Sequence, residues 1–218
     1  GAAHGFGRAI ALAFAQRGAA VWACDILAEE LTETEALGRA AGGQCRTRRV
    51  DLSQPAQVNA LVADVLAAQG RVDILVNNAG GVLGQVGRPL GQVTRQEWQS
   101  IFDVNTSGVF YCCQAVAPSM KAARYGRIVN ITSGTVKMTL AGLDLSSGAR
   151  AGLTGFLAGV ARSVAPHNVT INFLLPGTFE TDRLRANIEA NAKKQNIDVA
   201  QSRQNRINSV PAKRFGTT

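Results

Sequence analysis

Three glycines near the start of the chain have a spacing that suits a phosphate-binding loop. They are Gly1, Gly5 and Gly7, and the residues after them predict a helix with apolar side chains on one face. Small residues let the backbone approach a pyrophosphate, and a helix N-terminus offers free N–H groups and a positive dipole end to its charge. Taken alone, these glycines also fit a plain turn.

An acidic residue follows the next predicted strand. Asp25 stands 18 positions beyond Gly7, where an acid accepts hydrogen bonds from the hydroxyls of an adenosine ribose. A carboxylate there repels a 2′-phosphate, so NAD(H) is favoured over NADP(H). A solvated aspartate is the alternative, and the strand–helix pattern around Asp25 favours the nucleotide site.

These residues need elements to position them, and the chain alternates short β-branched runs with amphipathic segments. The runs are AAVWAC (19–24), QCRTRRV (44–50), VDILVN (72–77), GRIVNI (126–131) and VTINFLL (169–175). The alternation predicts an α/β fold with a parallel sheet covered by helices on both faces. Ser53 ahead of Pro55, and Thr94 with Glu97, predict two helix starts. The 218 residues are expected to form a single domain, 1–218.

Composition excludes several classes of protein. The net charge is +8, but the basic residues are scattered with few aromatics among them, so we expect no nucleic-acid partner. No apolar run reaches the roughly 18 residues that cross a bilayer, and the pattern of the first residues leads us to expect no secretion signal. Four cysteines without C-x-x-C spacing indicate free thiols in a reducing compartment, so we expect a cytoplasmic protein without a membrane partner.

Five ordered motifs together resemble the short-chain dehydrogenase/reductase family. They are the glycine loop, Asp51-Leu52, Asn77-Asn78-Ala79-Gly80, Asn105 with Ser133, and Asn172 with Pro176-Gly177 and Thr181. The resemblance runs almost end to end and implies a doubly wound, Rossmann-type sheet in the order 3-2-1-4-5-6-7, with the ligand at the carboxyl ends of the strands. The central strand of such a sheet would precede Gly1, so we expect flanking strands outside residues 1–218.

The resemblance also implies a cofactor site. Asp51 would hold the adenine amino group, Asn77 to Gly80 would flank the adenosine pocket, and the turn at Pro176, the Phe179 backbone and the Thr181 hydroxyl would contact the nicotinamide carboxamide. The implied cofactor-binding residues are Gly1, Gly5, Phe6, Gly7, Asp25, Asp51, Leu52, Asn78, Ala79, Gly80, Arg150, Pro176, Gly177, Phe179 and Thr181. No metal site is predicted.

Two positions depart from the family pattern of a serine, a tyrosine 13 positions later and a lysine four positions after that. Counting from Ser133 gives Ser146 and Arg150, so the implied catalytic residues are Asn105, Ser133, Ser146 and Arg150. The family tyrosine supplies a proton because the lysine lowers its pKa from about 10, whereas a serine hydroxyl is about as weak an acid as water. Arg150 still offers a permanent cation with five donors, and a water beside Ser146 could pass the proton.

Two hypotheses therefore stay open. The first is an NAD(H)-dependent oxidoreductase that acts on a carbonyl or secondary alcohol through an altered proton relay. The second is a non-catalytic NAD(H)-binding protein that serves as a sensor or partner subunit. The resemblance implies a substrate lid over 178–209 and a homodimer or homotetramer that uses the helices 147–164 and through Phe110. Residues 176–218 carry eight basic and four acidic side chains, which predicts a small-molecule substrate bearing a carboxylate or phosphate.

Overall fold

The computed structural model describes residues 1–138 and 140–217, and its strands alternate with helices as the sequence predicts. The strands are β1 (Ala20–Asp25), β2 (Gln44–Arg49), β3 (Ile74–Asn77), β4 (Gly126–Ile131) and β5 (Val169–Leu174). The α-helices are α1 (Gly5–Ala15), α2 (Ala28–Ala40), α3 (Pro55–Gln69), α4 (Arg95–Phe102), α5 (Gly108–Ala122), α6 (Asp144–Val164), α7 (Asp182–Gln195) and α8 (Val199–Ser209). All five predicted strands are confirmed.

Every strand pairing in the described residues is parallel. β1 pairs with β2, and β3, β4 and β5 form a second group in that order. These neighbours agree with the expected order 3-2-1-4-5-6-7, in which β1 and β2 are strands 2 and 3 and the other three are strands 4 to 6. No strand among the described residues joins β1 to β3. The α/β Rossmann-type fold is thus confirmed.

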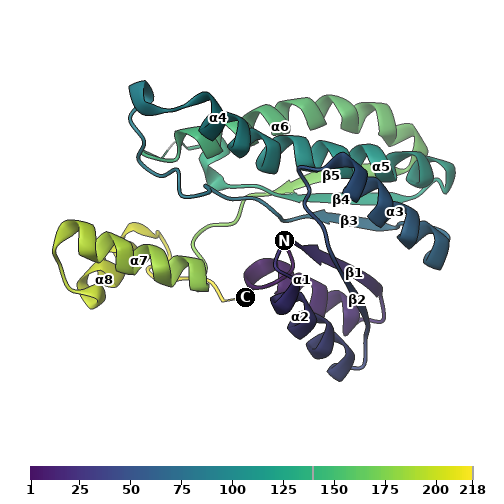
Figure 1. Cartoon of the computed structure of the whole chain (residues 1–218), viewed down its shortest axis with the longest axis horizontal. Coiled ribbons are helices and arrows are strands. Elements are labelled where there is room, and N and C mark those ends of the chain that lie inside the picture. Colours follow the sequence, from purple (N-terminus) through teal and green to yellow (C-terminus); the bar gives the residue numbers. More distant parts are fainter. Residues whose placement is uncertain (139, 218) are drawn as a thin grey trace. The chain divides into compact units, whose positions relative to one another are not determined.

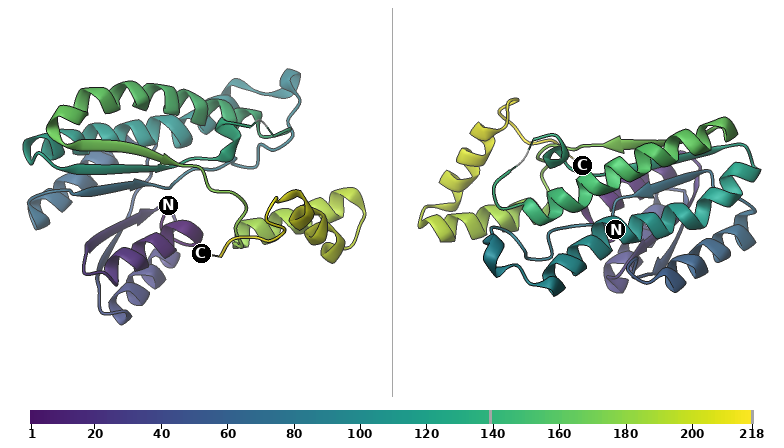
Figure 2. Two further views of the ribbon diagram at one scale, coloured as in Figure 1. Left: turned by 180° about the vertical axis from the view of Figure 1, so that it is seen from behind. Right: turned by 90° about the horizontal axis from the view of Figure 1, so that it is seen from above.

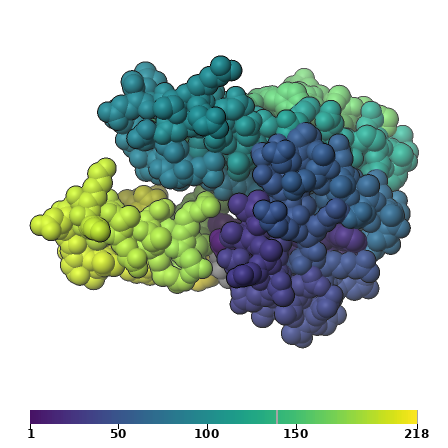
Figure 3. Space-filling view, in the orientation of Figure 1, coloured from purple at the N-terminus to yellow at the C-terminus, as the bar shows by residue number. Residues whose placement is uncertain are grey.

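Helices cover the two groups of strands from different sides. Figure 1 shows α5 and α6 on one side of β3–β5, with α1 and α2 beside β1 and β2 on the other. The main buried cluster lies between β4, β5, α5 and α6; its members are Val109, Cys113, Val116, Met120, Ile128, Leu153, Leu157, Val164, Val169 and Ile171. A smaller cluster joins α1 and α2 to their strands and includes Ala11, Ala15, Ala23, Leu31 and Cys45. In Figure 3 the part of the chain that contains both clusters, coloured purple through green, is closely packed.

Local capping signals had different outcomes. The capping box of Thr94 and Glu97 is present at the start of α4. The prediction that Ser53 caps α3 is wrong, because the helix begins at Pro55 after an N-cap residue, Gln54, whose side chain makes no cap hydrogen bond. Ser53 instead belongs to the turn after β2, where its N–H and its hydroxyl both donate to Asp51 Oδ1, at 2.9 and 2.7 Å.

The chain divides into two compact units, Gly1–Leu175 and Pro176–Thr218. The second unit contains the predicted lid, and its helices α7 and α8 contact each other (Figure 2). Leu184, Ile188 and Phe215 form its buried apolar cluster. Glu180 accepts two hydrogen bonds from Arg203, at 2.9 and 2.6 Å, and this guanidinium lies 5.0 Å from the centre of the Phe215 ring. The second unit therefore has an apolar cluster and an ion pair of its own.

The Glu180–Arg203 pair predicts a pH dependence for the second unit. Hydrogen bonds from Arg203 lower the pKa of Glu180 below its usual value. A carboxylate with a lowered folded-state pKa stabilises the fold above the ordinary glutamate range and loses this contribution as pH falls through the lowered pKa. We expect amide hydrogen exchange in 182–209 to accelerate on acidification, after correction for the intrinsic rate. Glu180→Gln should make the exchange faster at pH 7 and flatten its pH dependence.

The matched control is Asp182→Asn, because Asp182 forms an exposed pair with Arg185 on α7, and such pairs contribute little. If Glu180→Gln retains the full pH dependence of the unaltered protein, Glu180 is not its source.

Candidate functional site

The glycine loop is held so closely against its surroundings that side chains would not fit. A Cβ on Gly7 would lie 1.6 Å from the Gly1 carbonyl oxygen and 2.7 Å from Asn78 Nδ2, and a Cβ on Gly1 would lie 2.6 Å from the Ala79 backbone. Gly5 has a φ of +58°, in the left-handed region that favours glycine. Phe6 lies in the first turn of α1. The loop thus delivers the N-terminus of α1 to the carboxyl ends of β1 and β3.

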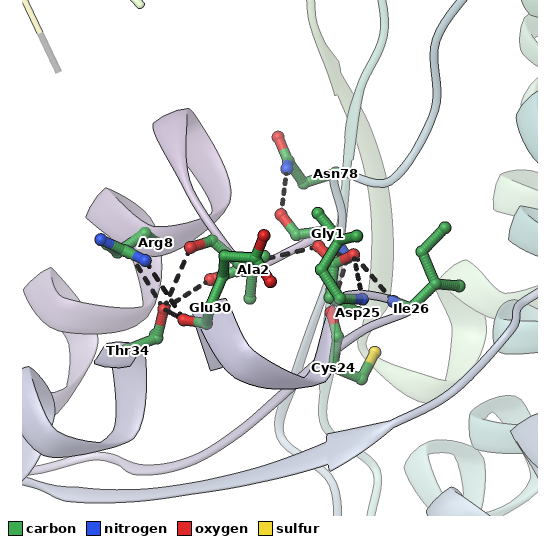
Figure 4. A network of polar contacts seen from close by, with 11 residues as sticks. Gly1, Ala2, Arg8, Cys24, Asp25, Ile26, Glu30, Thr34 and Asn78 are labelled. Atoms are coloured by element: carbon green, nitrogen blue, oxygen red, sulfur yellow. Dashed lines mark hydrogen bonds and ion pairs between the residues drawn. The ribbon is translucent and has the colours of Figure 1, made fainter. Parts of the chain in front are cut away.

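Asp25 ends β1 and bonds to the same loop (Figure 4). Its Oδ2 accepts from Ala3 N at 3.1 Å, and its Oδ1 accepts from Ile26 N at 2.7 Å and Leu27 N at 3.3 Å. Burial raises the pKa of Asp25, whereas the hydrogen bonds from these backbone donors lower it. The side chain is 14 % exposed. Asp25 is thus an ionised, oriented acceptor that still reaches the surface.

The turn after β3 closes the other side of the loop. Asn78 Nδ2 donates to the Gly1 carbonyl at 2.7 Å, and the buried Asn77 donates to Asn130 Oδ1 on β4 at 3.0 Å. Asp51 and Leu52 follow β2, where Asp51 Oδ1 accepts from Ser53 N and Oγ. Since all these strands are parallel, the residues after them share one edge of the fold.

Sequence reasoning missed Thr34, which bonds to the loop, and Arg8, whose side chain bonds to Thr34. Thr34 on α2 is fully buried, and its hydroxyl lies 2.9 Å from the Ala2 carbonyl oxygen and 3.0 Å from Arg8 Nε. The signal was present in the sequence: Leu31, Thr34 and Gly38 stand three and four positions apart, which is one face of a helix. A polar residue on the buried face of a helix indicates a specific hydrogen bond.

Asn105 lies in a π-helix, Asp103–Ser107, between α4 and α5. It is 2 % exposed; its Oδ1 accepts from Gly81 N at 3.0 Å, and its Nδ2 donates to the carbonyls of Gly81 and Ile101 at 2.9 Å each. One amide proton therefore holds the chain after β3, and the other bonds to α4. The side chain acts here as a structural link, and π-helical turns are frequent at functional sites.

Arg150 meets this link from α6. Its Nε donates to Ser146 Oγ at 3.3 Å and its Nη1 to the Ile131 carbonyl at 3.2 Å. A Cβ on Gly80 would lie 2.8 Å from both Arg150 Nη2 and Asn105 Oδ1, so the guanidinium and the amide share the space beside that glycine. The structure thus brings together Asn105, Ser146 and Arg150.

Ser133 and Ser146 differ in accessibility. Ser133 follows β4 by two residues, is partly exposed, and accepts from Thr135 N at 3.2 Å. Ser146 is 7 % exposed and lies one helical turn before Arg150. Because a hydroxyl that accepts one hydrogen bond keeps its own proton, both serines can still donate.

The remaining predicted cofactor residues begin the second unit. Pro176 and Gly177 precede Phe179, which forms a parallel bridge with Gly216. The Thr181 hydroxyl accepts from Leu184 N at 3.3 Å and thereby caps α7.

Other chemistry finds little support in residues 1–138 and 140–217. All four cysteines are free, and burial raises the pKa of Cys112 to about 12 and of Cys113 to about 11, which makes these thiols poor nucleophiles. No cluster of three or more His, Cys, Asp or Glu side chains suits a metal ion in these ranges. None of their helices combines the length and apolarity that a membrane span requires.

Known proteins share this arrangement. Residues 1–192 match the short chain dehydrogenase family. The 3-oxoacyl-[acyl-carrier-protein] reductase FabG of Escherichia coli (strain K12) is 36 % identical over 186 residues, which cover 85 % of this chain and 74 % of the reductase. NAD+-bound xylitol dehydrogenase superposes with a TM-score of 0.89 at 26 % identity, covering 99 % of this chain and 84 % of that one. A metagenomic short-chain oxidoreductase in complex with NADP superposes with a TM-score of 0.78 at 35 % identity, covering 83 % and 81 %. A match over most of the chain, with the glycine loop and the Asn78 turn in contact, makes this protein a member of the short chain dehydrogenase family.

Proposed function

We propose that this protein is an NAD(H)-dependent oxidoreductase that transfers a hydride between nicotinamide and a carbonyl or secondary alcohol substrate, with an altered proton relay. The observation that carries the proposal is the close packing of the glycine loop, which brings the N-terminus of α1 beside the carboxylate of Asp25. Relatives and neighbours with the same fold are named as reductases and dehydrogenases, and two of them contain NAD+ and NADP.

The residues of the first unit fit such a cofactor. The glycine loop leads into the first turn of α1, which provides N–H donors and the positive end of its dipole for a pyrophosphate. Asp25 would accept from the ribose hydroxyls, while Asp51, Leu52 and 78–80 would border the adenosine. In the second unit Pro176, Gly177, Phe179 and Thr181 would hold the carboxamide. When bound, the nicotinamide supplies or accepts the hydride.

The proton that accompanies the hydride must be supplied or removed with the help of this chain's own side chains. Arg150 is permanently cationic and is oriented by Ser146 and the Ile131 carbonyl, so its charge can stabilise an oxyanion that develops nearby. Ser133 can donate to a substrate oxygen, and Ser146 can hold a water that passes the proton. Without a positioned acid of suitable pKa, the rate should be about 10²–10⁴-fold below that of a complete site.

One observation favours the alternative of a non-catalytic NAD(H)-binding protein. Ser146 is 7 % exposed and already bonded to Arg150, so it offers little surface to a substrate. Binding of NADH without turnover of any substrate would select this alternative. Hydride transfer to a panel of neutral and anionic ketones, with NADH affinity measured in parallel, separates the two.

The charge of the second unit bears on the choice of panel. Two of its basic residues are paired with acids, Arg203 with Glu180 and Arg185 with Asp182. The other basic side chains there are Arg183, Lys193, Lys194, Arg206, Lys213 and Arg214. This excess supports substrates that carry a carboxylate or phosphate, and 3-oxoacyl thioesters belong in the panel because a relative is named for them.

Cofactor choice is the first test of the proposal. NADH should bind more tightly than NADPH by about tenfold or more, which corresponds to about 1.4 kcal/mol, because Asp25 repels a 2′-phosphate. Asp25→Ala should reduce the ratio of the two affinities. It should also weaken the binding of NADH, since the Ala3 N–H loses its acceptor. Calorimetric titration of both nucleotides measures the effect, with the exposed acid replacement Glu29→Ala as control. Equal affinities of the unaltered protein for NADH and NADPH would show that Asp25 does not discriminate between them.

The proposed proton relay is tested by restoring the tyrosine and lysine of the family pattern at positions 146 and 150. Ser146→Tyr together with Arg150→Lys should raise turnover of a simple ketone by up to about 10²–10⁴-fold. Ser146→Tyr alone should do less, because the Arg150 fork occupies the space beside residue 146. Ser133→Ala should abolish the native activity. An active protein indifferent to changes at Ser133, Ser146 and Arg150 would place the chemistry elsewhere.

We further propose that α5 and α6 mediate a homodimer or homotetramer. An apolar groove between them is lined by Phe110, Gln114, Phe156 and Val160 among others, and Phe156 is half exposed. The buried face of α6 carries Leu153 and Leu157, whereas Cβ atoms on its glycines would meet nothing within 4 Å; these glycines are Gly148, Gly152, Gly155 and Gly159. Their surface is thus not used in packing within the chain and permits close approach of a second helix.

Phe156→Glu should shift the protein toward the monomer, because it places a charge in an apolar contact. Leu37→Glu on α2 is the control, since Leu37 is comparably exposed away from the groove. Sedimentation velocity at micromolar concentration gives the readout. A monomeric unaltered protein, or equal dissociation by both variants, would contradict this interface.

A further inference from the structure

The backbone of the glycine loop is held from two sides by side chains of neighbouring elements. On one side Asp25 accepts from the N–H of Ala3. On the other side the hydroxyl of Thr34 lies 2.9 Å from the carbonyl oxygen of Ala2 and 3.4 Å from that of Ala3 (Figure 4). Both alanines are buried, so their polar groups depend on partners within the protein.

Arg8 decides the direction in which the Thr34 hydroxyl points. An arginine can only donate, and its Nε lies 3.0 Å from Thr34 Oγ1, so this oxygen is the acceptor there. The single hydroxyl proton is then directed to a carbonyl. The Ala2 carbonyl, at 2.9 Å, is nearer than that of Glu30 at 3.2 Å, which is the usual partner one helical turn earlier.

The Arg8 guanidinium is itself fixed by α2. Its Nη2 donates to the Glu30 carbonyl at 3.1 Å and pairs with Glu33 at 2.7 Å. The side chain is 19 % exposed, which limits the conformations open to it. Three contacts in series therefore lead to the loop. Arg8 contacts Glu30 and Glu33 of α2, it also contacts Thr34, and Thr34 contacts the Ala2 carbonyl.

We infer that Thr34, oriented by Arg8, is a positioning residue for the dinucleotide: it holds the Ala2 carbonyl toward α2 and so keeps the glycine loop in its binding conformation. This inference rests on the proposed function for its ligand, while the contact that it describes exists within the protein alone. Thr34 is fully buried and its hydroxyl lies against backbone carbonyls of the loop and of its own helix, so its effect on affinity comes through the loop.

Thr34→Val tests the inference because it keeps the shape and removes the hydroxyl. If the loop then spends about a tenth of its time in the binding conformation, the apparent Kd for NADH rises about tenfold. Turnover at saturating NADH should stay unchanged, so the KM for NADH should rise while kcat stays the same. Thr34→Ser retains the hydroxyl and should keep the affinity within about twofold of the unaltered value.

The matched control is Thr32→Val on the same helix. The Thr32 hydroxyl is exposed and donates only to the Ala28 carbonyl, at 3.2 Å. Arg8→Met should weaken NADH binding, as Thr34→Val does, whereas Arg17→Met should not, because the Arg17 side chain, just after α1, donates to the Ala13 carbonyl of that helix. All titrations are made at a temperature where circular dichroism shows each variant to be folded.

Amide hydrogen exchange of residues 1–8 without any nucleotide gives a readout that does not depend on the proposed function. Thr34→Val should accelerate exchange there, and Thr32→Val should leave it unchanged. If the unaltered protein fails to bind NADH while this acceleration is seen, the cofactor proposal falls and the role of Thr34 in holding the loop stands. Unchanged exchange with unchanged NADH affinity in Thr34→Val overturns the inference.

Discussion

The contact between the Gly1 carbonyl, the Gly7 backbone and the Asn78 amide is the point on which the first unit depends. A side chain at residue 7 would lie 1.6 Å from the Gly1 oxygen, so only glycine lets α1 start where it does. Asn78 donates to the same oxygen and thereby ties the start of α1 to the turn after β3. This one backbone oxygen links segments that lie 77 positions apart in the chain, and it brings the ends of β1 and β3 to one edge.

The same edge positions the second half of the site. Asn77 and Asn130 bond across β3 and β4, so the chain after each strand leaves at a fixed position. Asn105 then holds Gly81, and Arg150 reaches the Ile131 carbonyl from α6. Gly80 allows both side chains to lie against the backbone. Buried polar groups that are all paired in this way give a site whose geometry is rigid.

Local signals in the sequence were sufficient for the elements and for part of the site. The alternation of strands and helices was readable because β-branched runs and helical periodicity are local, as was the capping box of Thr94. The prediction for Ser53 failed because the Asp51 side chain holds Ser53 in the turn after β2. Residue preferences for helix caps take no account of such a side-chain bond. The π-helix at Asn105 and the bonds of Thr34 depend on partners 24 to 32 residues away, so no window of sequence contains them. The neighbours of each strand could be predicted only through the family resemblance.

Ser146 and Arg150 are best understood as one change rather than two. On the proposed reading, a serine at 146 vacates the volume of a tyrosine ring, and the arginine at 150 is longer than a lysine and carries a donor, Nε, at the level where it meets Ser146 Oγ. A lysine has no such donor along its stem. The same arginine extends Nη1 to Ile131 and Nη2 to the space beside Gly80, so its charge stays at the inner wall of the site. On the proposed function, the exchange would preserve a cation beside the reacting centre and give up the acid. A protein with this pair would bind and polarise a carbonyl oxygen more readily than it would protonate one.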